Sequence, residues 1–402
     1  MSENAFSLKT PRIEVIDALR GLAIMAIMLL HNLEHFDFYY LPEYLPEPIK
    51  VLDKIIWDTL FFLFAGKSYA IFSLLFGFSF FIQYDNQRKK GNDFRWRYVW
   101  RLAILFVFGL VNTLFFSGDI LMMYAVLGLI LIPVCNLNTK YVLIIATFLL
   151  MLPMEWFNFF NILFNPDYIL PANRSNAYYG DMYTYLTGSN SFVDHAVGNI
   201  SIGRWASVFW SWENGRFFQA PALFMFGMIA GRKQLFVISE ASIAFWKKAL
   251  LYAIILFIPL FAFKTYLPVL IANKDIVNSL LIIFTSWSNV SFMVVLVSTF
   301  VLLYQKEAIN KVLIKLIPFG KMSLTSYFSQ SILGSFIYYR FGLGLYQYTG
   351  ATFGLIIGII LFLLQLGFCT WWLKTHKQGP LEYIWHKATW ISFGKEKKAV
   401  TA

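Results

Sequence analysis

Three ionisable side chains lie at helical spacing in the first apolar stretch of the chain, DALRGLAIMAIMLLH, which contains Asp17, Arg20 and His31. At about 100° per residue, Arg20 and His31 lie within roughly 20° of one helix face and about 16 Å apart along the axis. Asp17 lies about 40° from His31, so all three share one stripe. Exposure of such groups to lipid is costly, and we therefore expect the stripe to face a bundle interior or a hydrated cavity.

An imidazole on this stripe is suited to proton transfer, because histidine titrates near neutral pH. His31 and His35 are the two candidates, and His35 would lie about 40° from His31 if the helix continues. We assign both histidines, with Asp17 and Arg20, to a candidate catalytic set. The alternative interpretation is structural: Asp17 and Arg20 form an i,i+3 ion pair at the membrane boundary, and His31 lies at the lipid headgroups.

Polar residues in later apolar segments are expected on the same side of the membrane as His31. Each of them alone is also compatible with helix packing or snorkelling. Together they predict a polar cup that is open to the outside and binds substrate. A lysine as deep as Lys67 needs a carboxylate, which Asp58 or Asp119 could supply. The candidate substrate-binding residues are Lys67, Asn112, Asp119, Glu155 and Arg216.

Membrane-spanning helices must position these residues. The chain of 402 residues is 58% hydrophobic and only 14% charged, far below the roughly 25% charged residues of a soluble domain. Apolar runs of about 20 residues cross a bilayer as helices. We therefore predict an all-α, polytopic membrane protein with about ten transmembrane helices in a single integral membrane domain, 1–402. The predicted spans are 13–33, 58–84, 102–116, 119–136, 141–163, 215–231, 246–264, 277–304, 321–340 and 351–373.

The distribution of positive charge predicts the orientation of these spans. With the N-terminus inside, 23 of the 33 Lys and Arg residues fall in cytoplasmic segments and 7 fall in outer segments. This bias predicts that both termini are cytoplasmic. The formal net charge of +11 then reflects topology and attraction to anionic membrane lipids, and no nucleic-acid partner is expected. Cys135 and Cys369 lack the spacing of a disulfide framework or a metal site, so we expect no metal.

One long segment, 164–212, is expected as an outer loop. It is rich in Asn, Ser, Tyr and Gly and ends in the aromatic stretch RWASVFWSW. Loops of this length are usually functional, and aromatic rings with amides are suited to a sugar or glycolipid. The alternative interpretation is an interfacial tryptophan belt.

The opening segment IDALRGLAIMAIMLLH resembles the first helix of the transmembrane acyltransferase superfamily, which includes heparan-type N-acetyltransferases and bacterial sugar O-acyltransferases. The whole chain is similar to the YeiB-type family of bacterial membrane proteins. The stretches that carry this resemblance are AGKSYAIFSLLFGFSF, GDILMMYAVLGL, FGKMSLTSYFSQSILGSFIYYRFGLGLY and GPLEYIWHKATW. We accordingly divide the chain into acyltransferase-like helices, 13–231, and a YeiB-type C-terminal region, 232–402. A short interfacial helix at 380–391 is expected in that region, held by Trp385 and Trp390.

The resemblance implies a transmembrane acyltransferase in the bacterial cytoplasmic membrane. The enzymatic relatives move an acyl group from cytosolic acyl-CoA, here acetyl-CoA, to an extracytoplasmic glycan or other cell-envelope acceptor, with a histidine as base or acyl relay. His31 occupies the place of the first-helix histidine of the O-acyltransferases, with the spacing to Arg20 retained, whereas the working histidine of the heparan-type enzymes lies nearer the position of His35. Lys67 or Asn112 could then stabilise an oxyanion. The sequence is compatible with a homodimer.

Two other classes of protein fit the same polar pattern. A transporter or flippase for a lipid-linked or small polar substrate also needs intramembrane acids, bases and histidines. A noncatalytic membrane scaffold would use them only for packing. Lys89, Lys90 and Arg95 could meet donor phosphates together with Arg20, or they could simply mark the cytoplasmic side.

Overall fold

The computed structural model describes residues 13–38, 40–42, 44–165 and 167–391, and every regular element in these ranges is helical. This confirms the predicted all-α class. The first half contains α1 (Glu14–Leu33), α2 (Glu47–Phe64), α3 (Lys67–Arg88), α4 (Arg95–Thr113), α5 (Leu121–Leu127), η1 (Gly128–Ile130), α6 (Leu131–Val134), α7 (Thr139–Leu150), α8 (Pro153–Phe164), α9 (Ser175–Gly188), α10 (Phe192–Gly198), η2 (Asn199–Gly203), α11 (Arg204–Glu213) and α12 (Arg216–Arg232). The second half contains α13 (Glu240–Leu270), α14 (Lys274–Tyr304), α15 (Glu307–Leu313), η3 (Ile314–Leu316), α16 (Ile317–Lys321), α17 (Ser323–Tyr338), η4 (Leu345–Gln347), α18 (Ala351–Trp372) and α19 (Pro380–Thr389).

Each of the ten predicted spans coincides with helix, but not always with one helix. The segment 58–84 is divided between α2 and α3 at Gly66, whose φ of +75° is favourable only for glycine. The segment 141–163 is α7 followed by α8, with a bend of 46°. By length and composition, four of the described helical segments can cross a membrane, or five if the bent pair is one span. The structure therefore contains several apolar helices. The count of about ten spans and their orientation remain predictions.

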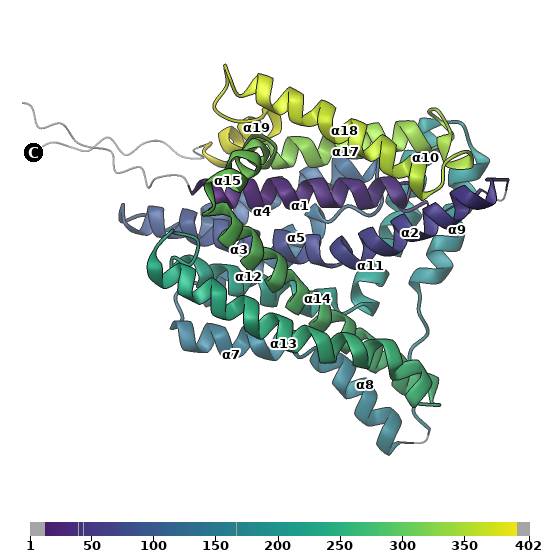
Figure 1. Cartoon of the computed structure of the whole chain (residues 1–402), viewed down its shortest axis with the longest axis horizontal. Coiled ribbons are helices and arrows are strands. Elements are labelled where there is room, and N and C mark those ends of the chain that lie inside the picture. Colours follow the sequence, from purple (N-terminus) through teal and green to yellow (C-terminus); the bar gives the residue numbers. More distant parts are fainter. Residues whose placement is uncertain (1–12, 39, 43, 166, 392–402) are drawn as a thin grey trace, which may run out of the picture.

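Helix α1 runs through the middle of the molecule, with α17 and α18 on one side of it and α3, α13 and α14 on the other (Figure 1). Close approach of helices depends on glycine. A Cβ atom on Gly77 of α3 would lie 1.8 Å from the carbonyl oxygen of Phe224, and one on Gly227 of α12 would lie 1.8 Å from that of Leu74. Such reciprocal small-residue contacts let two membrane helices pack backbone to backbone.

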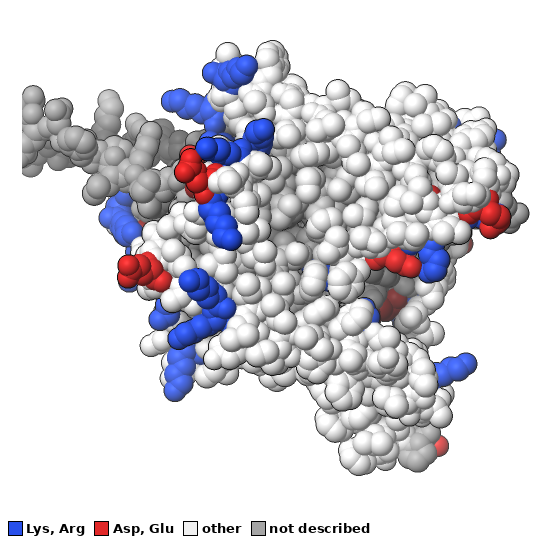
Figure 2. Space-filling view, viewed as in Figure 1, with Lys and Arg blue, Asp and Glu red and all other residues white. Residues whose placement is uncertain are grey.

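The surface separates into charged ends and an apolar middle. Lys and Arg gather at the left of Figure 2, at the end of the molecule where α1 begins and where α19 lies, and a broad band without charge follows. The outward faces of α7, α13 and α18 carry exposed Leu, Ile, Val and Phe side chains. In water such a continuous apolar surface would be unfavourable, and it identifies a membrane protein.

The expected outer loop at 164–212 is instead mostly helical, and this prediction was wrong for a physical reason. The helices α9, α10 and α11 form a cap in which the end of α11 is hydrogen-bonded to the start of α9. The carboxylate of Glu213, at the end of α11, accepts hydrogen bonds from the backbone N–H groups of Arg174 (2.6 Å) and Ser175 (3.2 Å) and from the Ser175 hydroxyl (2.5 Å). These bonds satisfy the first N–H groups of α9 and fix its start.

The last described helix, α19, lies within the predicted segment 380–391 and joins the two halves of the chain. Glu382 Oε1 accepts from the backbone N–H groups of Leu324 (2.7 Å) and Thr325 (3.1 Å), so a side chain of α19 caps α17. On the other side, the indole N–H of Trp385 donates to the carbonyl of Arg101 (3.1 Å), whose guanidinium lies 3.5 Å from the centre of the Trp385 ring. We call these contacts the α19 clasp.

Candidate functional site

A cavity of about 1440 Å³ lies between α1, α3, α5, α9, α11, α12 and α14. Figure 2 shows a hollow at the right of the view, between the surface over α2 and that over α13 and α14, with acidic and basic side chains inside it. Four of the predicted site residues line the cavity: His31, Lys67, Asp119 and Arg216. The other polar residues that we consider on its walls are Glu34, Asp37, Asp58, Tyr179, Arg204, Lys264 and Tyr327.

The structure places the two candidate histidines in different surroundings. The His31 ring lines the cavity, with ring centres of Phe116 at 4.8 Å and Phe36 at 5.4 Å, and its Nδ1 atom is buried without a hydrogen-bond partner among the described residues. His35 is 1% exposed, does not line the cavity, and shares a 3.0 Å hydrogen bond with the Thr349 hydroxyl through Nε2. Only His31 of the two is therefore placed to meet a ligand in the cavity.

A left-handed turn follows α1 and begins at His35. His35, Phe36 and Asp37 have φ values of 48°, 58° and 65°, which is a conformation that residues other than glycine rarely adopt and that costs about 1–3 kcal/mol for each residue. The turn ends α1 through a hydrogen bond from the Phe36 N–H to the His31 carbonyl (2.8 Å). It buries Phe36 and brings the Asp37 side chain to the cavity wall. Strain of this kind is frequently retained at functional sites.

Two carboxyl groups reach the cavity wall at the end of α1: Glu34 directly follows the helix, and Asp37 lies in the left-handed turn. Burial, together with the nearby Asp37 charge, raises the pKa of Glu34 to about 8, although Arg216 acts in the opposite direction. Burial raises the pKa of Asp37 to about 7. Gly118 makes room for the second acid, because a Cβ atom there would lie 2.2 Å from Asp37 Oδ2. Both acids can therefore carry a proton near neutral pH.

Neighbouring polar groups hold Asp119 in a fixed position. The Asn112 amide donates to Asp119 Oδ2 (2.8 Å), and the backbone N–H of Met122 donates to Asp119 Oδ1 (3.2 Å). Arg204 of α11 donates to the Asp119 carbonyl (2.6 Å). Asn112 is fully buried and does not line the cavity, so it acts on the cavity through Asp119.

The predicted cations Lys67 and Arg216 begin helices, and each follows a glycine with positive φ. The Lys67 ammonium lies 5.9 Å from the ring centre of Phe62 and 5.8 Å from that of Phe292. The Arg216 guanidinium lies 4.2 Å from the ring centre of Tyr69. Aromatic faces thus stabilise both charges.

The expected carboxylate partner of Lys67 is not found within ion-pair distance in the part of the chain that the structure describes. Asp58 pairs with Lys54 instead (2.8 Å), and Asp119 binds Asn112. Lys67 consequently offers a positive charge that aromatic rings surround and that an anionic ligand could neutralise.

Three other predicted residues lie outside the cavity. Arg20 binds Asp17 (2.9 Å) and Ser79 (3.1 Å), and neither Asp17 nor Arg20 belongs to the cavity wall. Glu155 lies on α8, which packs against α14, and is also absent from the wall. The polar stripe of α1 is thus divided between an ion pair near its start and the cavity at its end. Of the three residues on the stripe, only His31 lines the cavity.

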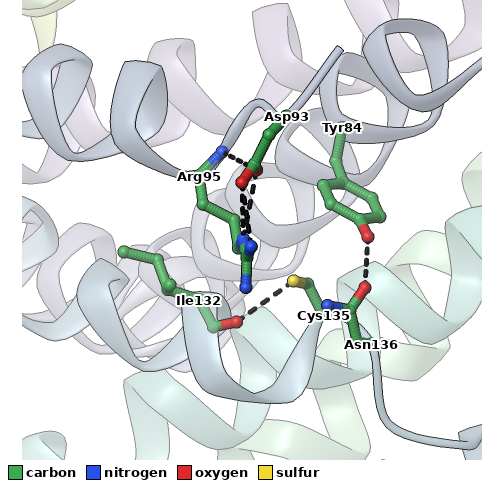
Figure 3. Close-up of polar contacts among 6 residues, drawn as sticks. All are labelled: Tyr84, Asp93, Arg95, Ile132, Cys135 and Asn136. Atoms are coloured by element: carbon green, nitrogen blue, oxygen red, sulfur yellow. Dashed lines mark hydrogen bonds and ion pairs between the residues drawn. The ribbon is translucent and has the colours of Figure 1, made fainter. Parts of the chain in front are cut away.

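Two of the loop cations considered for donor phosphates, Lys89 and Arg95, already have acidic partners. Lys89 pairs with Asp85 (2.6 Å), and Arg95 pairs with Asp93 (2.8 Å). Figure 3 shows the Asp93 carboxylate against the Arg95 guanidinium, near the Cys135 thiol, which donates to a backbone carbonyl. Among the described residues no group of His, Cys, Asp and Glu side chains could hold a metal ion.

Sequence reasoning missed Glu34, Asp37 and Arg204. The first two follow His31 within six residues in HNLEHFD, and an acid three residues after His31 at the end of a helix could have indicated one of them. Nothing in the sequence indicates the left-handed turn, because it contains no glycine. Arg204 lies in the segment that was expected to be a loop.

Comparisons with known proteins bear on both halves of the chain. Residues 12–183 match a family model described as "Heparan-alpha-glucosaminide N-acetyltransferase, catalytic", and residues 230–392 match one described as "Protein of unknown function (DUF418)". The chain is 28% identical to "Uncharacterized protein YxaH" of Bacillus subtilis (strain 168), over 98% of both chains. It is 22% identical to "Uncharacterized 39.9 kDa protein in amylase 3'region" of Bacillus acidopullulyticus, over 94% of both chains. No solved structure matches the chain.

The two family models cover different parts of the chain, an acetyltransferase-like part at 12–183 and a part of the DUF418 type at 230–392, and the division at 231 stays a prediction. The relatives span almost the entire chain, so the two halves occur together in them. These matches agree with the resemblance to the YeiB-type family of membrane proteins that the sequence motifs carry.

Proposed function

We propose that the protein is a membrane acyltransferase that moves an acyl group from acyl-CoA to an acceptor bound in the cavity, with His31 as the general base. One observation carries this proposal: the part of the chain that resembles an acetyltransferase catalytic region supplies a histidine to a large cavity that also has acidic and basic side chains on its wall. The donor is acetyl-CoA by the same resemblance. The acceptor is a hydroxyl or amine of an extracytoplasmic glycan or envelope molecule, and the membrane is the bacterial cytoplasmic membrane, with both termini inside.

The cavity wall fits the reacting end of such a donor. Phe36, Phe116 and Tyr327 surround the imidazole of His31, and this residue lines the cavity. Lys67 supplies positive charge for the thioester oxygen. Because Asp17 and Arg20 lie outside this cavity, the phosphates of the donor are expected to stay outside it as well.

The proposed reaction moves one proton and one acyl group, and His31 and Lys67 are sufficient for it. The neutral His31 ring takes the proton from the acceptor hydroxyl or amine while the acceptor oxygen or nitrogen attacks the thioester carbonyl carbon. Lys67 stabilises the negative charge on the carbonyl oxygen, an interaction that is worth about 3 kcal/mol per donor in other enzymes. The carbon–sulfur bond then breaks, and the imidazolium returns its proton to the departing thiolate.

The test compares the two histidines in one assay. Purified protein is incubated with labelled acetyl-CoA and cell-envelope extract, and labelled product is measured for the wild type, His31→Ala and His35→Ala. Removing a general base lowers the rate by about 10²–10⁴-fold, so we expect this loss for His31→Ala and a much smaller loss for His35→Ala. Equal activity of His31→Ala and wild type would contradict the proposal.

A proton-coupled transporter is the second candidate, and the two acids that follow α1, Glu34 and Asp37, favour it. Glu34 and Asp37 line the cavity and have raised pKa values of about 8 and about 7, so they could take up and release a proton near neutral pH. Uptake of a substrate into vesicles, without consumption of acyl-CoA, would favour this function over acyl transfer.

A further inference from the structure

Part of the cavity wall is both apolar and exposed, and this part points to the class of the substrate. Three apolar side chains line the cavity and are also exposed: Phe106 of α4 (37% exposed), Val126 of α5 (51%) and Trp205 of α11 (50%). We call these three residues the lateral window. The bond from Arg204 to the Asp119 carbonyl (2.6 Å) holds the start of α11, which carries Trp205, beside the residue that precedes α5 by two positions.

The lateral window lies within a surface that faces hydrocarbon. Its neighbours on α4 are Val107, Leu110 and Val111, which are 56%, 41% and 42% exposed, and Leu129, which follows α5, is 43% exposed. The charged residues of α4 are confined to its first turns, from Arg95 to Arg101. An exposed run of aliphatic side chains in the body of a membrane helix is typical of contact with lipid chains.

The window is continuous with the polar part of the cavity. Asp119 precedes α5 by two residues, and Val126 lies near the end of that helix. Met122 and Met123, which come between them in the sequence, also line the cavity and provide an apolar path from the window to the carboxylate. The opposite wall differs, because it carries Asp58, Lys67 and Lys264 and is suited to a hydrated path.

We propose that the acceptor is a membrane lipid whose hydroxyl- or amine-bearing headgroup enters the cavity at His31 while its hydrocarbon chain leaves through the lateral window. The inference rests on the proposed acyl transfer for the reaction and on the cavity alone for the binding. A polar cavity that opened only to water would serve a free sugar equally well. An apolar arm that ends among lipid-facing side chains serves only a molecule with a hydrocarbon tail.

Entry of a lipid is tested by photo-cross-linking. The purified full chain is reconstituted in vesicles of phosphatidylethanolamine and phosphatidylglycerol that contain phosphatidylethanolamine with a diazirine in its acyl chain. After illumination, peptide mass spectrometry should find adducts on Met122 and Met123, inside the cavity. Val126→Trp narrows the window and should reduce these adducts severalfold. Val107→Trp, an exposed site that does not line the cavity, is the matched control and should leave them unchanged.

Equal labelling of Met122 and Met123 in the two variants, or labelling confined to the outer face of α4, would overturn the inference. Because Val126 and Val107 are both exposed, size-exclusion profiles should show that both variants remain folded. Phe106→Ala provides a second variant in the opposite direction, since it widens the window and should increase the adducts.

The chemical arm uses the same vesicles with labelled acetyl-CoA, and the products are divided into an organic and an aqueous phase. Label in the organic phase supports a lipid acceptor. Label only in a water-soluble product would overturn the lipid acceptor and leave acyl transfer standing. Absence of label from both phases would contradict the proposed function, whereas the cross-linking result would still decide whether a lipid enters the cavity.

Discussion

The carboxyl of Glu34 should make the protein less stable as the pH rises. Its pKa increases from the ordinary value of 4.5 to about 8, chiefly because of burial and then because of the charge of Asp37. The folded protein therefore binds more protons than the unfolded chain between these two pH values. Its stability is greatest below about pH 4.5 and falls until the pH exceeds about 8.

The size of this effect follows from the same two values. One pKa unit corresponds to about 1.4 kcal/mol, so a rise from 4.5 to about 8 sets an upper limit of about 5 kcal/mol at high pH. Glu34 is only half-buried because it lines the cavity. Water in the cavity lessens the desolvation, and we expect about 2 kcal/mol of the full amount to be realised.

The assay is thermal unfolding of the purified protein in detergent between pH 5 and pH 9 for the wild type, Glu34→Gln and Glu47→Gln. Because glutamine is neutral throughout, Glu34→Gln should match the wild type at pH 5 and exceed it in Tm by a few degrees at pH 9. Asp37 should leave a smaller decline in the variant, since its pKa also increases, to about 7. Glu47, an exposed acid on α2, is the control. Parallel Tm curves for the wild type and Glu34→Gln would refute the reasoning.

Three further substitutions test other contacts. Glu382→Ala removes the carboxylate that accepts hydrogen bonds from the first N–H groups of α17, and it should lower the free energy of unfolding by about 2 kcal/mol, measured by thermal unfolding. An unchanged Tm would show that the α19 clasp adds no stability. Gly118→Ala places a Cβ atom 2.2 Å from Asp37 Oδ2 and 2.5 Å from the buried ring of Phe116, so both side chains must move and the Tm should fall by a few degrees. An unchanged Tm would show that this position does not need glycine. Thr349→Val removes the hydrogen bond to His35 and should leave the rate of acyl transfer within about twofold of the wild type, because His35 lies outside the cavity. A large loss of acyl transfer would indicate that His35 takes part in the reaction.

Helical periodicity predicted the angular position of residues on α1 correctly, but it could not predict what each part of the helix contacts. Arg20 and His31 lie near one face, yet different elements pack against that face at the two ends. The backbone of α16 touches α1 at Asp17, where a Cβ atom on Gly320 would lie 1.8 Å from the Asp17 carbonyl oxygen. At the other end, the rings of Phe116 and Tyr327 surround His31. Tertiary packing therefore divides a stripe that is continuous in the sequence.

Residues at helix ends were predicted best when a hydrophobic run set the boundary. Lys67, Asp119 and Arg216 all begin or precede helices at the edge of apolar segments, and all three reach the cavity. The left-handed turn at 35–37 and the helical cap at 175–213 were not predictable in the same way. The turn is imposed by tertiary contacts, such as the burial of Phe36, and the cap is too polar to show the hydrophobic period of a membrane helix.

Reaction of the purified protein with bromoacetyl-CoA, followed by peptide mass spectrometry, tests the central claim most directly. The reagent carries an electrophilic carbon next to the position of the acyl carbonyl and alkylates a nucleophile beside a bound donor. If the donor's reacting end lies in the cavity, the main adduct should be on His31, should be prevented by excess acetyl-CoA, and should be lost in His31→Ala. An acetyl-CoA-protected adduct elsewhere, for example on Cys135, with His31 unmodified, would contradict the account.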